Sequence, residues 1–259
     1  MKDVLAGVIA AVESQGALLA AEFLRPEGPR GRRGSAPIDR EMEERLRDTL
    51  QGLVACAFVG EETGLTPGKI AACAWIVDPH DGTSEFTGGK RGSAISVGLI
   101  RDSRPVLGVV HSPLSPDRGA DTIAWAEGAG PIRRNGKPLD VDLSQGLLAA
   151  GGFVFATGSS ALRPGAWSRA VAPARYIAMP SIAYRLARVA AGDGVATVSV
   201  HGVNEYDIAA GMALIRAAGG VVLDAKGKTV VLEGKAERRL SGCFAGAPAA
   251  AAQLARHDW

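Results

Sequence analysis

The sequence predicts an α/β (α+β) protein, built as a single domain of two lobes at approximately residues 1–140 and 141–259. In the first half, two helix patterns are followed by strands of a mainly antiparallel sheet. The second half alternates strands with helices, which is typical of a helix-covered sheet of mixed direction. No Pro-rich linker separates the halves, so we expect them to share one interface and, at 259 residues, a substantial core.

In the first lobe, apolar residues at helical spacing predict a helix over 4–24, and a second helix over 39–53 begins with Asp39 in its first turn. The segment between them (25–35) is rich in Gly, Pro and Arg, as mobile loops are. Asn135-Gly136 is a strong hairpin signal. Short apolar runs predict strands at 55–59, 71–77, 92–99, 106–111 and 122–127.

The second lobe carries shorter elements separated by glycines. An amphipathic pattern predicts a helix over 181–191, and a further helix over 208–218 is stopped by Gly219-Gly220. Buried strands are predicted at 147–155, 175–178, 195–200 and 221–223.

Composition excludes several functional classes. The net charge of +2, from 29 basic and 27 acidic residues, gives no electrostatic basis for binding nucleic acid or a membrane surface. Asp3 and Glu13 interrupt the apolar N-terminal stretch, so we expect neither a signal peptide nor a membrane span. The expected location is the cytoplasm.

The three cysteines, Cys56, Cys73 and Cys243, lie in apolar surroundings at spacings that match no zinc pattern. An odd count without a C-x-x-C motif argues against a disulfide framework. We therefore expect buried free thiols in a reducing compartment.

The most informative segment is Trp75–Ser84, which predicts a strand that ends in a tight turn. Pro79 restricts the backbone and Gly82 relaxes it, so Asp78 and Asp81 project from a stiff turn. Two carboxylates directed to one place repel each other unless a cation lies between them, and Mg²⁺ favours such oxygen ligands. An Asx-rich surface turn is the alternative reading of this motif taken alone.

Further acidic residues stand at the ends of predicted elements. Asp39 and Asp207 begin helices and could be N-caps, while Glu61 ends a strand and could form a solvated pair with Glu62. Taken together, five carboxylates come from four segments, and such a gathering of like charge predicts bound cations.

Three segments of this chain resemble the signature segments of the inositol monophosphatase superfamily, whose members are magnesium-dependent, lithium-sensitive phosphomonoesterases. The segments are Gly60-Glu61-Glu62, Trp75–Ser84 and Tyr206–Gly211. The resemblance covers about residues 1–255. It implies a layered αβαβα sandwich of the sugar-phosphatase type, with an antiparallel N-terminal sheet, a mixed C-terminal sheet, and a homodimeric assembly.

The resemblance also implies two to three Mg²⁺ ions. One ion would be held by Glu61, Asp78 and the backbone carbonyl of His80. A second would be held by Asp78, Asp81 and Asp207, with Asp78 bridging the two ions.

The catalytic roles follow from the same resemblance. Glu61 and Thr83 would position and deprotonate the attacking water, and Asp39 would lie in the outer shell of a third, weaker ion. The backbone N–H groups of Gly82, Thr83 and Ser84 would hold the phosphate at a helix N-terminus.

Three residues depart from the family pattern or stand beside it. His80 occupies an aliphatic position, and we expect its imidazole to pack or face solvent rather than bind metal. Tyr206 replaces a tryptophan, one flat aromatic ring for another. Glu205 could reach substrate, although we expect it to face water.

A family lysine upstream of Asp39 has no clear counterpart. Arg30, Arg32 or Arg33 could take its electrostatic role, or these arginines could simply form a solvated loop.

The substrate is less strongly indicated than the chemistry. Val200 stands where true inositol phosphatases carry an acidic residue, which weakens that assignment. The 3′(2′),5′-bisphosphate nucleotidase branch also lacks this acid, and it needs a site for a second phosphate. Arg185, Arg188 or the Arg30–Arg33 loop could provide one, although arginines at such helix positions are more often surface charges.

The sequence therefore predicts Mg²⁺-dependent hydrolysis of a small phosphate monoester. An inositol monophosphate or related polyol phosphate is the leading substrate, and adenosine 3′,5′-bisphosphate is the alternative. Histidinol phosphate, a sugar phosphate, or a non-catalytic binding module are further readings. The chain contains neither G-x-S-x-G nor a P-loop, so no covalent nucleophile is expected.

Overall fold

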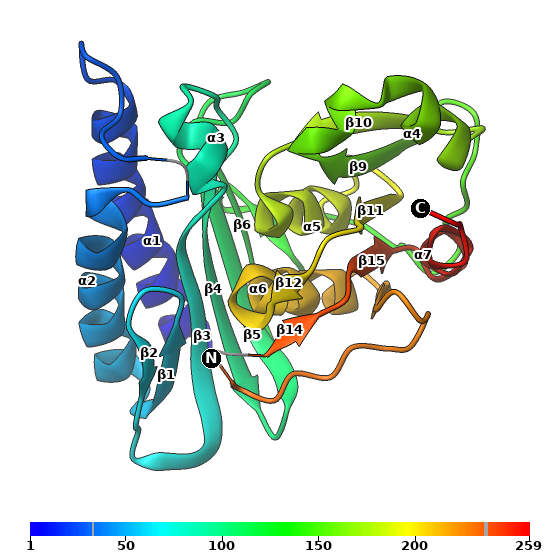
Figure 1. Ribbon diagram of the computed structural model, residues 1–259. Helices are drawn as coiled ribbons and strands as arrows, with labels where there is room; N and C mark the ends of the chain where they lie inside the picture. Colours follow the sequence, from blue (N-terminus) through cyan, green and yellow to red (C-terminus); the bar gives the residue numbers. More distant parts are fainter. Residues whose placement is uncertain (33, 236–237) are drawn as a thin grey trace.

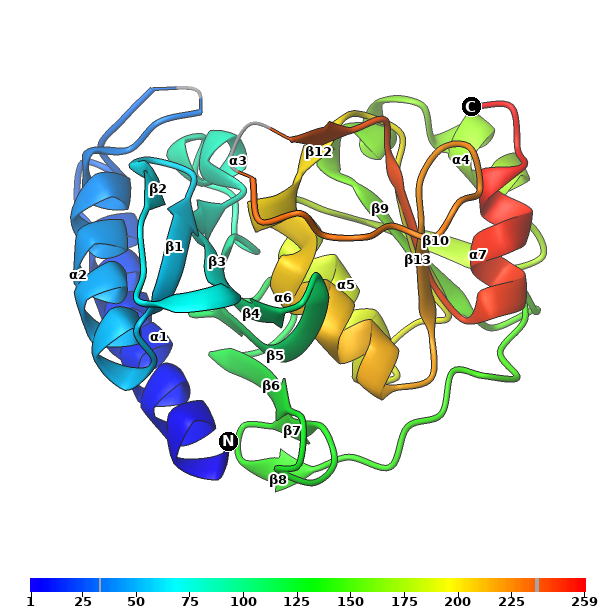
Figure 2. The same ribbon diagram turned by 90° about the horizontal axis from the view of Figure 1, so that it is seen from below.

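The computed structural model describes residues 1–32, 34–235 and 238–259, which form five alternating layers of helices and sheets (Figure 1). One helix pair covers the outer face of the first sheet, a second pair lies between the two sheets, and a third covers the far face of the second sheet (Figures 1 and 2). The predicted αβαβα sandwich is confirmed. In layer order the helices are α1 (Lys2–Phe23), α2 (Pro37–Leu53), α5 (Ile182–Ala190), α6 (Glu205–Ala217), α4 (Pro164–Ala170) and α7 (Pro248–Ala255).

The first sheet has eight strands in the order β2-β1-β3-β4-β5-β6-β7-β8. All pairs are antiparallel except β1 with β3, as expected for a mainly antiparallel lobe. The Asn135-Gly136 hairpin joins β7 to β8, and both of its residues have positive φ. The bounds are β1 (Cys56–Gly60), β2 (Gly64–Thr66), β3 (Ile70–Asp81), β4 (Ala94–Arg101), β5 (Arg104–Ser112), β6 (Asp121–Ala126), β7 (Arg133–Arg134) and β8 (Lys137–Pro138).

Strand β3 is covered on both faces, which explains its continuous apolar run. Trp75 and Val77 pack into the core formed with α1 and α2, whereas Ala74 and Ile76 pack into the core shared with α5 and α6. Successive side chains of a strand point to opposite faces, so each layer of helices covers one alternating set.

Helix α6 lies unusually close to the first sheet. A Cβ at Gly98 of β4 would stand 2.9 Å from the backbone N of Ala210, and one at Gly108 of β5 would stand 2.2 Å from the carbonyl oxygen of Ala210. Only glycine allows such an approach, and it brings the start of α6 next to the end of β3.

The second sheet has five strands in the order β10-β9-β11-β15-β13 and is mixed, as predicted. The strand expected at 147–155 begins only at Phe153, because residues 147–152 form an irregular, glycine-containing connection. A separate two-stranded ribbon pairs β12 with β14. The bounds are β9 (Phe153–Thr157), β10 (Arg175–Met179), β11 (Ala196–Ser199), β12 (Val203–Asn204), β13 (Val221–Leu223), β14 (Arg239–Leu240) and β15 (Cys243–Gly246).

Helix α1 is long and apolar enough to cross a membrane by length and composition, which the sequence reading did not expect. Its buried residues Leu5, Val8, Val12 and Leu19 pack against the first sheet and α2. A core helix needs the same apolar composition, so this helix is weak evidence for a membrane span.

The expectation of three free thiols is wrong for two of the cysteines. Cys56 of β1 and Cys73 of β3 form a disulfide, while Cys243 is free and buried. These two strands are neighbours in the first sheet, and the pairing brings the sulfurs together although no C-x-x-C motif marks them. Sequence spacing alone did not reveal this contact.

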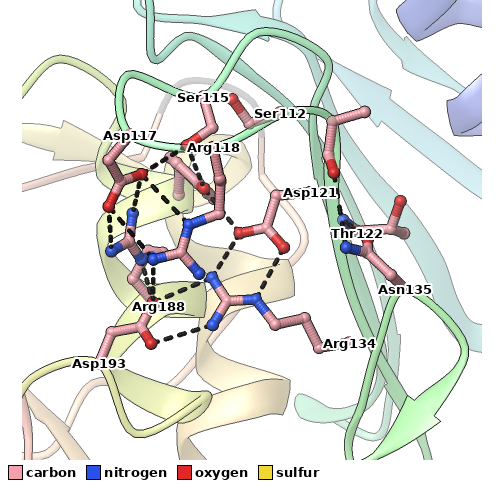
Figure 3. Close-up of polar contacts among 12 residues, drawn as sticks. Ser112, Ser115, Asp117, Arg118, Asp121, Thr122, Arg134, Asn135, Arg188 and Asp193 are labelled. Atoms are coloured by element: carbon pink, nitrogen blue, oxygen red, sulfur yellow. Dashed lines mark hydrogen bonds and ion pairs between the residues drawn. The ribbon is translucent and has the colours of Figure 1, made fainter.

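An ion-pair network joins the two lobes beside α5 (Figure 3). Arg134 of the first lobe donates to Asp121 at 2.6 Å and to Asp193 at 2.9 Å. Arg188 of α5 binds the same Asp193 and also Asp117, the latter at 2.9 Å. Arg188 is only 4% exposed, so its reading as a surface charge is wrong.

Candidate active site

A cavity of about 250 Å³ lies where β3 ends, and it brings together the carboxylates predicted from distant segments. Glu61, Asp78, Asp81 and Asp207 all line it. The predicted phosphate-binding residues line the same cavity, together with several residues that the sequence did not indicate. The remaining lining residues are Gly34, His80, Gly82, Thr83, Ser84, Glu85, Thr157 and Pro180.

The parallel pairing of β1 with β3 explains why Glu61 and Asp78 meet. Gly60 pairs with Val77, so the two strands reach the same sheet edge and the next residue of each is acidic. The N–H of Glu61 donates to the carbonyl oxygen of Val77 at 3.3 Å. Glu61 and Asp78 are distant in sequence, and this strand pairing fixes them side by side.

Helix N-termini hold the other two carboxylates. The Oδ2 of Asp81 accepts hydrogen bonds from the Ser181 hydroxyl and the Ala183 N–H, both at 2.6 Å, at the start of α5. The Oδ2 of Asp207 accepts from the Asn204 N–H at 2.6 Å, within the capping box of α6. In both aspartates, the hydrogen bonds to Oδ2 fix the orientation of the carboxylate.

Glu205, in the first turn of α6, is 0% exposed, so the expectation that it faces water is wrong. Its carboxylate accepts hydrogen bonds from the backbone N–H groups of Glu233 and Gly234 and from the Arg238 side chain, all at 2.7 Å. The segment before β14 is thereby held against the start of α6.

Burial makes this cluster electrostatically costly. Partial desolvation of the Glu61 carboxylate in the cavity, with the nearby carboxylates adding to it, raises its pKa to about 7, although the residue as a whole stays exposed to solvent. The same causes raise the pKa of Asp78 and Asp207 well above the ordinary aspartate range, and burial also raises that of Asp81. The charge of Glu61 is among the causes that raise the pKa of Asp78, because two like charges repel each other.

The donor set fits a hard divalent cation. None of the described lining residues is Lys or Arg, so no protein cation compensates the carboxylates inside the cavity. Among the described residues, no three His, Cys, Asp or Glu side chains already stand as a ready-made metal-binding group. Asp81 and Asp207 each keep one oxygen that accepts no hydrogen bond from a described residue, and that oxygen is available to a cation.

The turn after β3 forms the floor of the cavity. Gly82 adopts φ +98°, a left-handed conformation, and caps the five-residue helix α3 (Thr83–Thr87). The first N–H groups of this helix have no partner within it. The hydroxyl of Thr83 donates to the carbonyl oxygen of His80 at 2.6 Å, the oxygen predicted to bind metal.

The imidazole of His80 packs in the interior, one of the two positions expected for it. Its Nδ1 lies 2.7 Å from the Oδ1 of Asp39, and its ring meets the Phe86 ring edge to face at 4.3 Å. Asp39 is buried and lies behind His80, outside the set of residues that line the cavity. Asp39 therefore has no direct place in the lining of the cavity, although its negative charge contributes to the raised pKa of Glu61.

The predicted arginine contacts lie outside the cavity lining. Arg185 is 2% exposed and donates to the carbonyl oxygen of Val198 at 2.7 Å and the Ser199 hydroxyl at 2.8 Å. The reading of Arg185 as a surface charge is thus wrong. Burial lowers the pKa of Arg185 to about 10, with Asp81 nearby opposing that change.

The arginine-rich loop approaches the cavity through its backbone. Arg30 forms an ion pair with Glu22 at 2.7 Å, and Arg32 forms an isolated bridge with Ser35. Arg33 lies outside the described residues. Gly34 itself lines the cavity.

The residues that sequence reasoning missed are of two kinds. Glu85 directly follows Thr83 and Ser84 in α3, so its position after the recognised motif could have indicated it. Thr157 is the last residue of β9 and Pro180 directly follows β10 in the second lobe, and no local signal marks them. They reach the cavity only because the lobes pack together.

Comparison with known proteins indicates the same family as the sequence motifs do. A model of the inositol monophosphatase family matches residues 33–257. Inositol-1-monophosphatase of Rhizobium meliloti is 34% identical over 206 residues, which cover 75% of this chain and 73% of that protein. Fructose-1,6-bisphosphatase/inositol-1-monophosphatase of Thermotoga maritima is 30% identical over 195 residues, covering 74% and 71% of the two chains.

The fold has a counterpart among solved structures. The crystal structure of extragenic suppressor protein suhB from Bartonella henselae superposes with a TM-score of 0.78 at 22% identity, covering 98% of this chain and 97% of that one. The extent of the family match, the identity to curated relatives and the shared fold agree. The chain belongs to the inositol monophosphatase family, a family of phosphoric monoester hydrolases.

Proposed function

We propose that this protein hydrolyses a small phosphate monoester with the help of two to three Mg²⁺ ions. The observation that carries the proposal is the convergence of Glu61, Asp78, Asp81 and Asp207 on one cavity without a basic side chain in its described lining. A divalent cation supplies positive charge to the phosphoryl oxygens and lowers the pKa of a water that it binds. Metal dependence is in keeping with the family.

Glu61 and Thr83 are suited to orient the attacking water. Thr83 donates its hydroxyl proton to the carbonyl oxygen of His80, so its lone pairs remain free to accept a hydrogen bond from water. Glu61 lies in the same cavity and can take up the water proton. No covalent intermediate with the protein is required.

The backbone at Gly82, Thr83 and Ser84 is suited to hold the phosphate. These residues line the cavity, and the left-handed turn at Gly82 leaves the first N–H groups of α3 without an intrahelical partner. A helix of five residues has only a small dipole, so the N–H donors themselves carry this interaction. The phosphorus is then placed for in-line attack by water.

We propose an inositol monophosphate or a related polyol phosphate as the leading substrate. The names of the Rhizobium meliloti and Thermotoga maritima relatives support this class. The bisphosphate nucleotidase alternative loses one suggested contact, since Arg185 is buried and bonded to protein groups. We also propose that the protein is a lithium-sensitive homodimer located in the cytoplasm.

Phosphate release measured on a substrate panel tests this proposal. The panel comprises inositol 1-phosphate, adenosine 3′,5′-bisphosphate, fructose 1,6-bisphosphate and histidinol phosphate, each with and without Mg²⁺. Asp81→Asn should abolish Mg²⁺-dependent release while the circular dichroism spectrum stays native, because the cluster loses a charged ligand. Asp102→Asn, at an exposed turn, is the control and should stay active.

Near-full activity of Asp81→Asn would refute its role as a metal ligand. If the wild-type protein released phosphate from no substrate in the presence of Mg²⁺, a non-catalytic binding module would be the better description.

A further inference from the structure

A separate groove of about 420 Å³ lies between α1 and the first sheet. Among the described residues, it shares no lining residue with the catalytic cavity. Glu13, Gly16, Ala17 and Ala20 line its helix side, at the spacing of one face of a helix. Residues at the end of β5, at the start of β6 and in the Asn135-Gly136 hairpin line the opposite side. We call this space the α1 groove.

The imidazole of His111 is a buried part of the groove wall. His111 is only 4% exposed, and its ring edge lies against the backbone of α1, since a Cβ at Gly16 would stand 2.2 Å from Nε2. Only glycine leaves room for the ring at this position. Ala17 and Ala20 continue the same face of α1 with side chains too small to fill the groove. The ring nitrogen and the open space therefore lie on one side of the helix.

A chain of hydrogen bonds decides which nitrogen of His111 carries the proton. The Thr122 hydroxyl donates to Oε1 of Glu13 at 3.0 Å, and its oxygen lies 2.9 Å from Nδ1 of His111. A hydroxyl has a single proton, so the Thr122 oxygen accepts a hydrogen bond from Nδ1–H. Burial lowers the pKa of His111, although Glu13 and Asp121 oppose that change, so the ring is neutral near pH 7. Nε2 is therefore a hydrogen-bond acceptor.

The free polar atoms of the α1 groove are acceptors. Nε2 of His111 has no partner among the described residues, and it is not sealed from solvent. Glu13 is exposed, and its Oε2 likewise accepts no hydrogen bond from a described residue. The Asn135 amide is turned toward the protein: Oδ1 accepts from the Thr122 N–H at 2.7 Å, and Nδ2 is directed at the Ala120 carbonyl oxygen at 3.5 Å (Figure 3). None of the described lining residues is Lys or Arg.

This set of groups selects among ligand classes. A phosphate or carboxylate would bring acceptors to an acceptor and would be repelled by Glu13. A divalent metal ion needs more protein ligands, and no three His, Cys, Asp or Glu side chains of the described residues stand together. A primary ammonium group carries only donors and a positive charge, which match Glu13 and the His111 acceptor. The alanine side chains and Pro113 offer apolar surface to an alkyl chain.

We propose that the α1 groove binds a primary alkylammonium ion. Glu13 pairs with its charge, Nε2 of His111 accepts one of its N–H groups, and the alkyl chain lies along Ala17 and Ala20. Thr122 is a positioning residue, because its hydroxyl holds His111 in the tautomer that leaves Nε2 unprotonated. This site lies outside the catalytic cavity, and the inference does not depend on the proposed phosphatase function.

A titration of the full-length protein with butylammonium and with 1-butanol tests the proposal, with binding followed by nuclear magnetic resonance. The two probes share an alkyl chain, and only one carries the charge. We expect butylammonium to bind about tenfold more tightly, the size of a charge-assisted hydrogen bond. It should also shift the Nε2 resonance of His111, which a merely structural histidine would not show.

Three variants locate the site. Glu13→Gln keeps the acceptor for Thr122 and loses the charge, so butylammonium should bind about fivefold more weakly. His111→Asn keeps a donor toward Thr122 and lacks the acceptor at Nε2, which should weaken binding about tenfold. Ala17→Leu, at an exposed position, should fill the groove and abolish binding without lowering the melting temperature.

Asp3→Asn is the matched control, since it removes one negative charge from α1 outside the groove and should bind as wild type. Equal affinity for the two probes, no binding of butylammonium, or unchanged affinity in Ala17→Leu would overturn the proposal. Ala17→Leu and Glu13→Gln decide the matter if His111→Asn does not fold. Phosphate release is not a readout of this experiment, so a failure of the proposed function would leave its result intact.

Discussion

The Nδ1 of His80 lies 2.7 Å from the Oδ1 of Asp39, and both side chains are buried. The second oxygen of the same carboxylate accepts the backbone N–H of Ala36 at 2.9 Å, which closes the first turn of α2. One aspartate thus ties a helix N-terminus to the turn that carries Asp78 and Asp81.

We expect His80→Leu to destabilise the protein by about 1–3 kcal/mol, because it leaves a buried carboxylate oxygen of Asp39 without its partner. Urea unfolding of His80→Leu, Asp39→Asn and the double variant measures the coupling, which should exceed about 1 kcal/mol. Strictly additive effects would show that the pair contributes nothing. His201→Leu, at an exposed position, should change stability by less than about 0.5 kcal/mol.

Arg134 should be far more important for stability than its neighbour Arg133. Arg134→Ala leaves Asp121, which is 0% exposed, without its ion-pair partner, and breaking such a buried pair costs about 3–5 kcal/mol. Among the described residues, the Arg133 side chain donates only to the carbonyl oxygen of Gly136, so Arg133→Ala should cost about 0.5 kcal/mol or less. Equal unfolding midpoints for the two variants would contradict the role assigned to the network in Figure 3.

The metal-free protein should lose stability as pH rises from about 5 to about 8. Partial desolvation raises the pKa of Glu61 from its ordinary 4.5 to about 7, so the folded protein holds a proton that the unfolded chain has released in that window. Glu61 is exposed to solvent, which screens this effect, so we expect folding to weaken with rising pH by about 1 kcal/mol or less. Asp117 does not contribute in this window. Burial would raise the pKa of Asp117, but hydrogen bonds from Arg118 and Arg188 hold that pKa below its ordinary value.

Thermal melting in EDTA across this pH range measures the effect, and Asp78→Asn should flatten it by removing one of the coupled carboxyls. Saturating Mg²⁺ should restore stability most at the high end of the range, where the carboxylates are ionised. A melting temperature that rises with pH in EDTA would contradict the raised pKa values.

Thiol titration of the unfolded protein without reductant should detect one thiol, that of Cys243, rather than three. The disulfide between Cys56 and Cys73 spans 17 residues, and a cross-link of that length stabilises by about 3 kcal/mol. Reduction should lower the unfolding midpoint accordingly. Three reactive thiols in protein purified without reductant would show that the pair stays reduced.

Much of the fold could be predicted because its elements depend on local patterns. The apolar spacing of α1, the short apolar runs of β4 and β5, and the turn chemistry of Asn135-Gly136 are properties of adjacent residues. Short elements such as β12 and β14 escaped prediction, since a few residues carry too little pattern. Their form depends on the lobes packed around them.

The sequence by itself determined the acidic motifs, since residues such as Asp78 and Asp81 are close along the chain and their turn is stiff. Only the tertiary structure decided what surrounds them: Arg188 and Glu205 are buried, Cys56 is bonded to Cys73, and His80 is paired with Asp39. Each of those outcomes joins residues that are distant in sequence. Whether a charge faces water or a partner depends on the packing of separate elements, which local patterns do not encode.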